Sequence, residues 1–148
     1  MLKRILLATV VVLLGSLSAA AQDQKPATPP AADFKIPPDA AKQPNPVKPT
    51  AESLAKGKKT FGIDCAMCHG KTGDGKGDLA VEIKMNLRDY RDPESLKSMT
   101  DGELYYIIKN GKGDMPAEGD RAKGDETWNL VNYVRSLAKK EGDAKDKS

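Results

Sequence analysis

The five residues Cys65-Ala66-Met67-Cys68-His69 decide how this chain is expected to fold. Two cysteines separated by two residues and followed at once by histidine form the pattern through which a c-type haem is attached to protein. The two thiols can add to the two vinyl groups of one porphyrin, and the residues between them set the required spacing. His69 then comes up beneath the iron as its proximal ligand. The sequence therefore predicts one haem c, bound covalently through Cys65 and Cys68.

Three other uses of these residues compete with haem attachment. Structural zinc needs four ligands, whereas the chain has two cysteines and one histidine. A thioredoxin-like pair should follow a strand in a βαβ unit, and no alternating β-branched run precedes Cys65. A structural disulfide stays open as an alternative in an oxidising compartment. It would leave the adjacent histidine, His69, without a role.

Residues 1–21 have the features of a secretory signal peptide. Lys3 and Arg4 provide the positive start, residues 5–14 the apolar stretch, and residues 19–21 a small-residue cleavage site. The apolar stretch is shorter than the roughly 20 residues of a membrane span, so we expect cleavage and export to the periplasm. An uncleaved anchor is the alternative, and only then do we expect membrane attachment.

The net charge of the chain excludes few classes of function. Cleavage would remove two of the 24 basic residues and none of the 21 acidic ones, which leaves 22 against 21 and a net charge of about +1. Such a balance gives no indication of a nucleic-acid partner.

The rest of the chain divides by composition. Residues 22–49 contain eight of the ten prolines, which exclude helix over most of that stretch. Residues 22–32 are expected to be a spacer. Residues 34–49 are either more spacer or an ordered arm over the haem domain, because Phe34, Ile36 and Val47 interrupt the polar sequence. We expect the haem domain over residues 50–140 and a fraying charged tail over residues 141–148.

Two helices are predicted early in the haem domain and near its middle. Thr50 is placed as the N-cap of a helix over residues 51–64. Gly57 lies on the apolar face of that helix, and since glycine costs about 1 kcal/mol in a helix, we expect another helix to approach closely there. Thr100 and Glu103 form a capping box for a helix that should end at Gly111.

The remaining elements are a last helix and a long irregular stretch. Asp125 is expected to cap a helix over residues 126–139 that buries Leu130, Val134 and Leu137. Residues 70–98 show no clear period, and the glycines at their start predict a surface loop around the haem edge. Four apolar side chains of this stretch are expected to point inward: Leu79, Val81, Ile83 and Leu87.

Methionine is the available soft ligand for the sixth position on iron, since there is no second histidine. Met67 lies between the two cysteines and cannot reach the far face, and Met99 is placed in a hydrophobic staple before the capped helix. Met115 follows a flexible glycine-containing turn and precedes a proline, so it is the predicted ligand. Met85 is the alternative.

The motifs C-A-M-C-H-G, G-K-G-D-M-P and W-N-L-V-N-Y-V-R-S-L resemble those of small bacterial mono-haem cytochromes c. The resemblance implies an all-α cytochrome c fold with three to five helices around one covalently bound haem. It implies that Gly57 and Phe61 meet the face around Val131 and Val134. Many members have a proline soon after the C-x-x-C-H motif whose carbonyl orients the histidine, and this chain has none before Pro93.

We therefore expect a non-enzymatic, monomeric, periplasmic one-electron carrier. Its haem would be ligated by His69 and Met115, and it would shuttle electrons between respiratory-type protein partners. One alternative is a cytochrome subunit docked in a larger oxidase or dehydrogenase. Another is a peroxidase-like or gas-binding haem protein, if Met115 is not a stable ligand.

Overall fold

The structure is a computed structural model that describes residues 34–119, 121–122 and 124–138. The predicted signal peptide, the spacer over residues 22–32 and the tail over residues 141–148 lie outside the described residues. The elements in chain order are α1 (Pro38–Ala41), α2 (Ala51–Thr60), the π-helix η1 (Phe61–Cys65), α3 (Ala66–His69), α4 (Asp78–Glu82), α5 (Asp101–Asn110) and α6 (Glu126–Ser136). No strand occurs in this described part, which confirms the all-α fold class.

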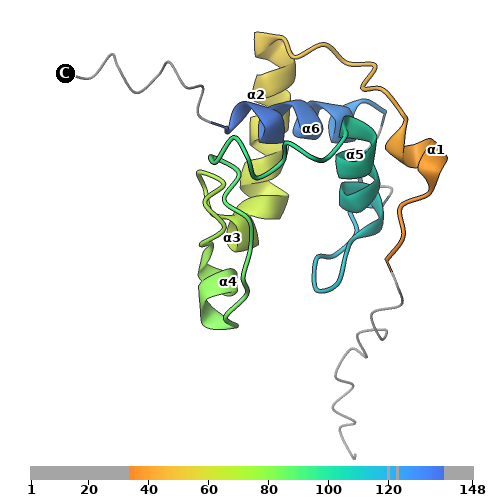
Figure 1. The fold of residues 1–148 in the computed structure, drawn as a ribbon. Helices are drawn as coiled ribbons and strands as arrows, with labels where there is room; N and C mark the ends of the chain where they lie inside the picture. The colour runs from red at the N-terminus through yellow and green to blue at the C-terminus, as the bar shows by residue number, and fades with distance from the viewer. Residues whose placement is uncertain (1–33, 120, 123, 139–148) are drawn as a thin grey trace, which may run out of the picture.

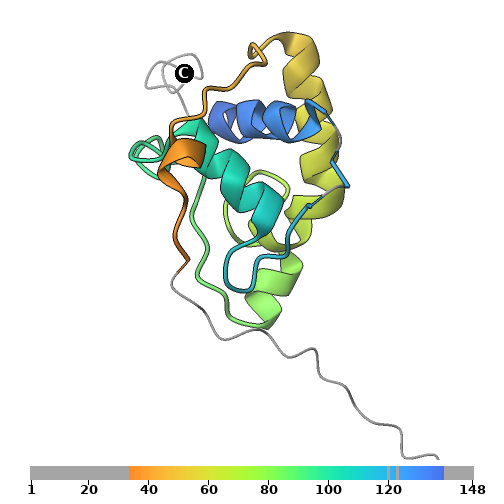
Figure 2. The same ribbon diagram turned by 90° about the vertical axis from the view of Figure 1, so that its right-hand side faces the viewer.

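The first and last long helices, α2 and α6, cross at the centre of the fold (Figures 1 and 2). A Cβ added to Gly57 would lie 2.2 Å from the carbonyl oxygen of Asn129 and 2.7 Å from Cβ of Tyr133. Real side chains do not tolerate such distances, so the crossing depends on this glycine. The close approach expected at Gly57 is confirmed, although the α6 residues that face it are Asn129 and Tyr133.

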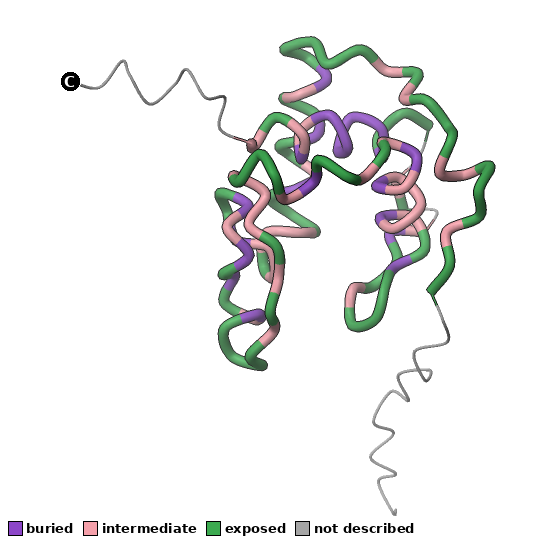
Figure 3. The backbone as a smooth tube through the Cα atoms, in the orientation of Figure 1, coloured by how far each residue is buried: buried purple, intermediate pink, exposed green. Residues whose placement is uncertain are grey.

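The hydrophobic core lies where α2, η1, α5 and α6 meet (Figure 3). Its buried side chains are Phe61, Leu96, Leu104, Ile108, Trp128, Leu130, Val131 and Val134. Phe61 shares this cluster with Val131 and Val134, as the family resemblance implied. The apolar stripe of α6 follows the helical period, which is why its sequence alone indicated the buried face.

The start of α5 has the predicted capping box. The Thr100 hydroxyl accepts from the backbone N–H of Glu103 (3.1 Å), and the Glu103 carboxylate accepts from the N–H of Thr100 (2.7 Å). The helix ends at Gly111, as expected. Arg135 of α6 holds the start of α5 in place, because its guanidinium donates to the Asp101 carboxylate (2.9 Å).

Some local expectations were wrong. The predicted helix over residues 51–64 changes to π-helix at Phe61, where the N–H of Ala66 donates to the carbonyl five residues before it. The last helix ends at Ser136, and the Asp125 side chain makes no capping hydrogen bond; its carbonyl accepts from the N–H of Asn129 instead.

Two of the four side chains that were expected to point inward from the irregular stretch are exposed. Val81 is 64% and Ile83 is 55% exposed. Both follow the start of the short helix α4, which turns only Ala80 into the interior. Leu79 and Leu87 are half-buried.

Residues 34–50, which we call the strap, lie against α5 and α6. The Asn45 side chain donates to the Asn132 side chain of α6 (2.9 Å), and Asn132 donates to the Val47 carbonyl (2.9 Å). The Thr100 hydroxyl donates to the carbonyl of Ala41 (2.6 Å). Backbone carbonyls that proline-rich sequence leaves unpaired are thus satisfied by side chains of the helices.

Candidate haem-attachment site

Cys65 and Cys68 stand at the junction of η1 and α3. The π-helical turn adds a residue just before Cys65 and shifts that side chain around the helix relative to a regular α-helix. Cys68 follows within the single turn of α3. Both thiols are free and half-buried, and Cys65 packs against the core cluster.

The glycine-containing loop after His69 returns to close the end of α3. The N–H of Gly75 donates to the His69 carbonyl (2.8 Å), and the N–H of Gly77 donates to the Cys68 carbonyl (3.0 Å). The last carbonyls of a helix need such partners, since the helix itself offers none. The loop therefore supports the C-x-x-C-H segment, and this is the role we assign to its glycines.

The ionisation of Cys65 argues against a reactive thiol pair. Burial, followed by the nearby charges of Glu118 and Asp64, raises the pKa of Cys65 to about 12. A thiol with such a pKa is protonated at neutral pH, whereas redox-exchange cysteines have lowered values. The site thus lacks the electropositive surroundings of a thioredoxin-like pair.

The His69 imidazole lies close to two aromatic rings. It stacks on Tyr90 with ring centroids 5.0 Å apart and an interplanar angle of 23°, and the Phe61 centroid lies 6.5 Å away. Burial lowers the pKa of His69 and so favours the neutral ring, which is the form that binds metal. Nδ1 is buried without a hydrogen-bond partner among the described residues. Ring packing therefore orients this histidine where many relatives of the predicted family use a proline carbonyl.

Tyr90 was missed by the sequence analysis. It belongs to the irregular stretch between α4 and α5, and no period or motif marks it. Its backbone N–H donates to the Gly73 carbonyl (2.7 Å), which fixes it against the loop that follows the histidine. Burial also raises the pKa of Tyr90 to about 12. A lone aromatic residue in an aperiodic stretch after C-x-x-C-H is the only signal that was available.

Met115 lies in a tight turn after α5. The N–H of Lys112 donates to the Met115 carbonyl and the N–H of Met115 to the Lys112 carbonyl, both at 3.0 Å. Its side chain is half-buried and packs against the same core cluster as Cys65 and Tyr90. Figure 1 shows α3 and α4 on one side of the lower half of the molecule and the loop after α5 on the other.

The other methionines of the described chain are placed differently. Met67 is 63% exposed, consistent with its position between the cysteines. Met99 is half-buried against the core before α5, as a residue of a hydrophobic staple would be. Met85 is half-buried in the segment after α4. His69 thus lies in α3, and Met115 lies in the loop after α5.

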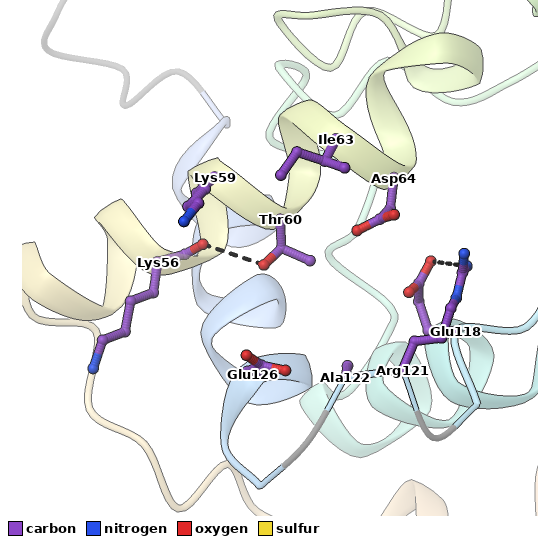
Figure 4. A pocket seen from close by; sticks show the side chains of 9 residues that line it. All are labelled: Lys56, Lys59, Thr60, Ile63, Asp64, Glu118, Arg121, Ala122 and Glu126. Carbon is purple, nitrogen blue, oxygen red and sulfur yellow. Dashed lines mark hydrogen bonds and ion pairs between the residues drawn. The ribbon is translucent and has the colours of Figure 1, made fainter.

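A separate pocket of about 380 Å³ lies between α2, η1 and residues 118–126 (Figure 4). Its charged lining contains both signs: Lys56, Lys59, Asp64, Glu118, Arg121 and Glu126. Glu118 is buried and forms a 2.9 Å ion pair with Arg121. Burial raises the pKa of Glu118 above its usual range. None of the four predicted haem residues lines this pocket, so it is distinct from the candidate haem site.

The residues present therefore fit a covalently bound haem. Two free, half-buried thiols stand one helical turn apart, and a half-buried imidazole with a lowered pKa follows them. Soft sulfur and imidazole are ligands that haem iron takes in cytochromes c. This helical fold and the C-x-x-C-H segment define the class as a small cytochrome c.

Comparison with known proteins identifies the family. The model described as "Cytochrome C oxidase, cbb3-type, subunit III" matches residues 52–134, more than half of the chain. The chain belongs to this family of cytochromes c, and membership implies a covalently bound haem c.

Individual relatives agree with this assignment. The chain is 36% identical over 88 residues to cytochrome c6 of Cladophora glomerata, with 60% of this chain and 92% of the relative covered. It is 36% identical over 91 residues to the cbb3-type cytochrome c oxidase subunit FixP of Bradyrhizobium diazoefficiens, with 60% and 31% covered. These relationships support a cytochrome c that carries electrons.

Solved structures also resemble the fold. A chain of the reducing HAO-like protein complex of Kuenenia stuttgartiensis matches with a TM-score of 0.55 and 28% identity, over 64% of this chain and 47% of that one. The present chain thus spans about half of that chain. The c-type cytochrome KustC0563 matches with a TM-score of 0.50 and 26% identity, over 56% of this chain and 98% of its own.

Among the described residues, none of the helices combines the length and the apolar character needed to cross a membrane.

Proposed function

We propose that the chain is a periplasmic one-electron carrier whose haem c is attached through Cys65 and Cys68 and ligated by His69 and Met115. The observation that carries this proposal is the placement of Met115 in a closed turn against the core cluster that Cys65 and Tyr90 also touch. A haem held there supplies a one-electron couple. We further propose cleavage of residues 1–21 during export, a monomer, and protein partners as donor and acceptor.

The protein residues would favour electron transfer over chemistry at the iron. If His69 and Met115 both hold the iron, a substrate would find no free place on it, and this is why we propose a carrier that is not an enzyme. Two ligands on packed segments also change little between redox states. The thioether of Met115 and the apolar surroundings of the site both favour the reduced state and a higher potential.

Replacement of Met115 tests the assignment. We predict that the purified oxidised wild-type protein shows the weak far-red absorption band of sulfur-ligated haem, and that Met115→Ala abolishes it while haem stays covalently attached. The variant should also bind cyanide faster, because the distal position becomes accessible. Met85→Ala is the matched control and should keep the band. Loss of the band in Met85→Ala alone would transfer the ligand role to Met85.

A second candidate function is a cytochrome subunit of a larger oxidase or dehydrogenase. It is favoured by the family description and by the similarity to FixP and to the HAO-like complex chain. Gel filtration of a native extract with haem staining separates the two: a free carrier elutes near its monomer mass, and a subunit elutes with a complex. Rapid cyanide binding by the wild-type protein would instead support the peroxidase-like or gas-binding alternative.

A further inference from the structure

The strap over residues 34–50 ends beside the turn that presents Met115. The ring of Phe34, the first described residue, lies against Tyr106 of α5 with centroids 6.0 Å apart and planes tilted by 57°. The ammonium of Lys112 lies 5.6 Å from the centroid of the same Phe34 ring. Phe34 therefore contacts both the helix before the Met115 turn and the turn itself.

Lys112 links this ring to Met115 directly. Its backbone exchanges two 3.0 Å hydrogen bonds with Met115, so the two residues form the base of one closed turn. The tip of the turn has little packing of its own, since residues 112–114 are all exposed. A contact that restrains the Lys112 side chain consequently restrains the backbone from which Met115 projects. An ammonium over an aromatic face is such a contact.

The strap is anchored firmly enough to act on the turn. Its middle is tied to α6 by the hydrogen bonds between Asn45, Asn132 and Val47. Its α1 segment lies on the start of α5, where a Cβ on Gly102 would be 2.1 Å from the carbonyl oxygen of Ala40. Phe34 therefore lies at one end of the described strap, and the rest of the strap is anchored on α5 and α6. These anchors help to set the position of Phe34 over Lys112.

We propose that the strap is a positioning element for the distal ligand, with Phe34 as the positioning residue that holds the Lys112–Met115 turn closed. This inference rests on the proposed role of Met115. It gives the proline-rich segment a function in the redox site: by restraining the turn, the strap disfavours detachment of the methionine and entry of an outside ligand. The prolines suit this role because their fixed φ angles lower the entropic cost of ordering the segment.

The test uses the full-length haem-loaded protein and imidazole as the competing ligand. Phe34→Ala should bind imidazole roughly three- to tenfold more tightly than wild type, as expected from losing one cation–π and one aromatic contact. Its far-red band should weaken at the same imidazole concentration. Lys112→Gln, which keeps the backbone turn and removes the charge, should shift affinity in the same direction. Phe34→Trp retains a ring and should restore wild-type affinity.

Lys35→Ala is the matched control on the strap and should leave imidazole affinity unchanged. A Phe34→Ala protein with lowered thermal stability but wild-type imidazole affinity would overturn the inference, because the contact would then be structural only. A wild-type protein without the far-red band would overturn the ligand role of Met115 and this inference together. If wild type shows the far-red band and the band resists imidazole equally well in Phe34→Ala, the role of the strap is overturned and the ligand role of Met115 stands.

Discussion

At the scale of single residues, Gly57 shows how one absent methyl group permits the crossing of the two long helices. The α6 backbone oxygen of Asn129 occupies the space that a Cβ would need. Gly62, one helical turn and a half later, has no atom within 4 Å of the equivalent position. The same residue type thus serves packing at one site and has no steric role at the other.

We predict that Gly57→Ala destabilises the protein by about 1–3 kcal/mol, because overpacking outweighs the gain of about 1 kcal/mol in helix propensity. Gly62→Ala, the matched control, should be neutral or slightly stabilising. Urea unfolding of the haem-loaded variants measures both. Equal stability of the two variants would show that α2 and α6 do not approach as closely as described.

At the scale of elements, the start of α5 is where three segments are joined. Thr100 caps the helix and also donates to the strap carbonyl of Ala41, and Arg135 of α6 binds Asp101 in the first turn. The N-cap of α2 is simpler: the Thr50 hydroxyl accepts from the N–H of Ser53 (3.2 Å). The two threonines have the same local role and differ in their long-range contact.

Threonine replacement should separate these contributions. Thr50→Ala is expected to cost about 1 kcal/mol for the lost cap. Thr100→Ala should cost about 0.5–1.5 kcal/mol more, because it also loses the hydrogen bond to the strap. Thr100→Ser keeps both contacts and should be close to wild type in thermal unfolding. Losses of the same size in the two alanine variants would contradict a stabilising role for the strap contact.

At the scale of the whole molecule, the apolar core is unevenly distributed. Eight of the nine buried hydrophobic side chains belong to the cluster around α2, η1, α5 and α6, and Ala80 is the one that lies in α4. The segment with α3, α4 and the following loop therefore buries little apolar surface in the core. A bound porphyrin provides a large flat apolar surface that would compensate for this shortage.

Removal of the haem should accordingly affect the two parts differently. In Cys65→Ser/Cys68→Ser, which cannot form thioethers, we predict rapid amide hydrogen exchange over residues 66–90 and partial retention of protection in α5 and α6. Exchange in the haem-loaded wild type, followed by mass spectrometry, is the reference. Matching protection of residues 66–90 in the two proteins would show that this segment is stable without the cofactor.

Signals within short stretches of sequence predicted several features of the helices. The capping box at Thr100, the end of α5 at Gly111 and the close approach at Gly57 were all predicted, because each depends on neighbours within a few residues or on the special shape of glycine. The exposure of Val81 and Ile83 was not predicted. A helix as short as α4 buries only the side chains that a neighbouring segment covers. The side-chain cap at Asp125 failed for a related reason: the chain entering α6 has a backbone conformation that does not direct the carboxylate to the helix N–H groups.

What the amino-acid sequence determined by itself is the chemistry of the site and the helical class, because thiol spacing, an adjacent imidazole and helix signals are properties of short stretches. Tertiary structure decided which distant groups support that chemistry. Tyr90 stacks on His69, and the Phe34 ring lies next to the ammonium of Lys112, far along the chain. Such contacts join residues tens of positions apart, and their energies exist only once the helices have packed, so no local pattern encodes them.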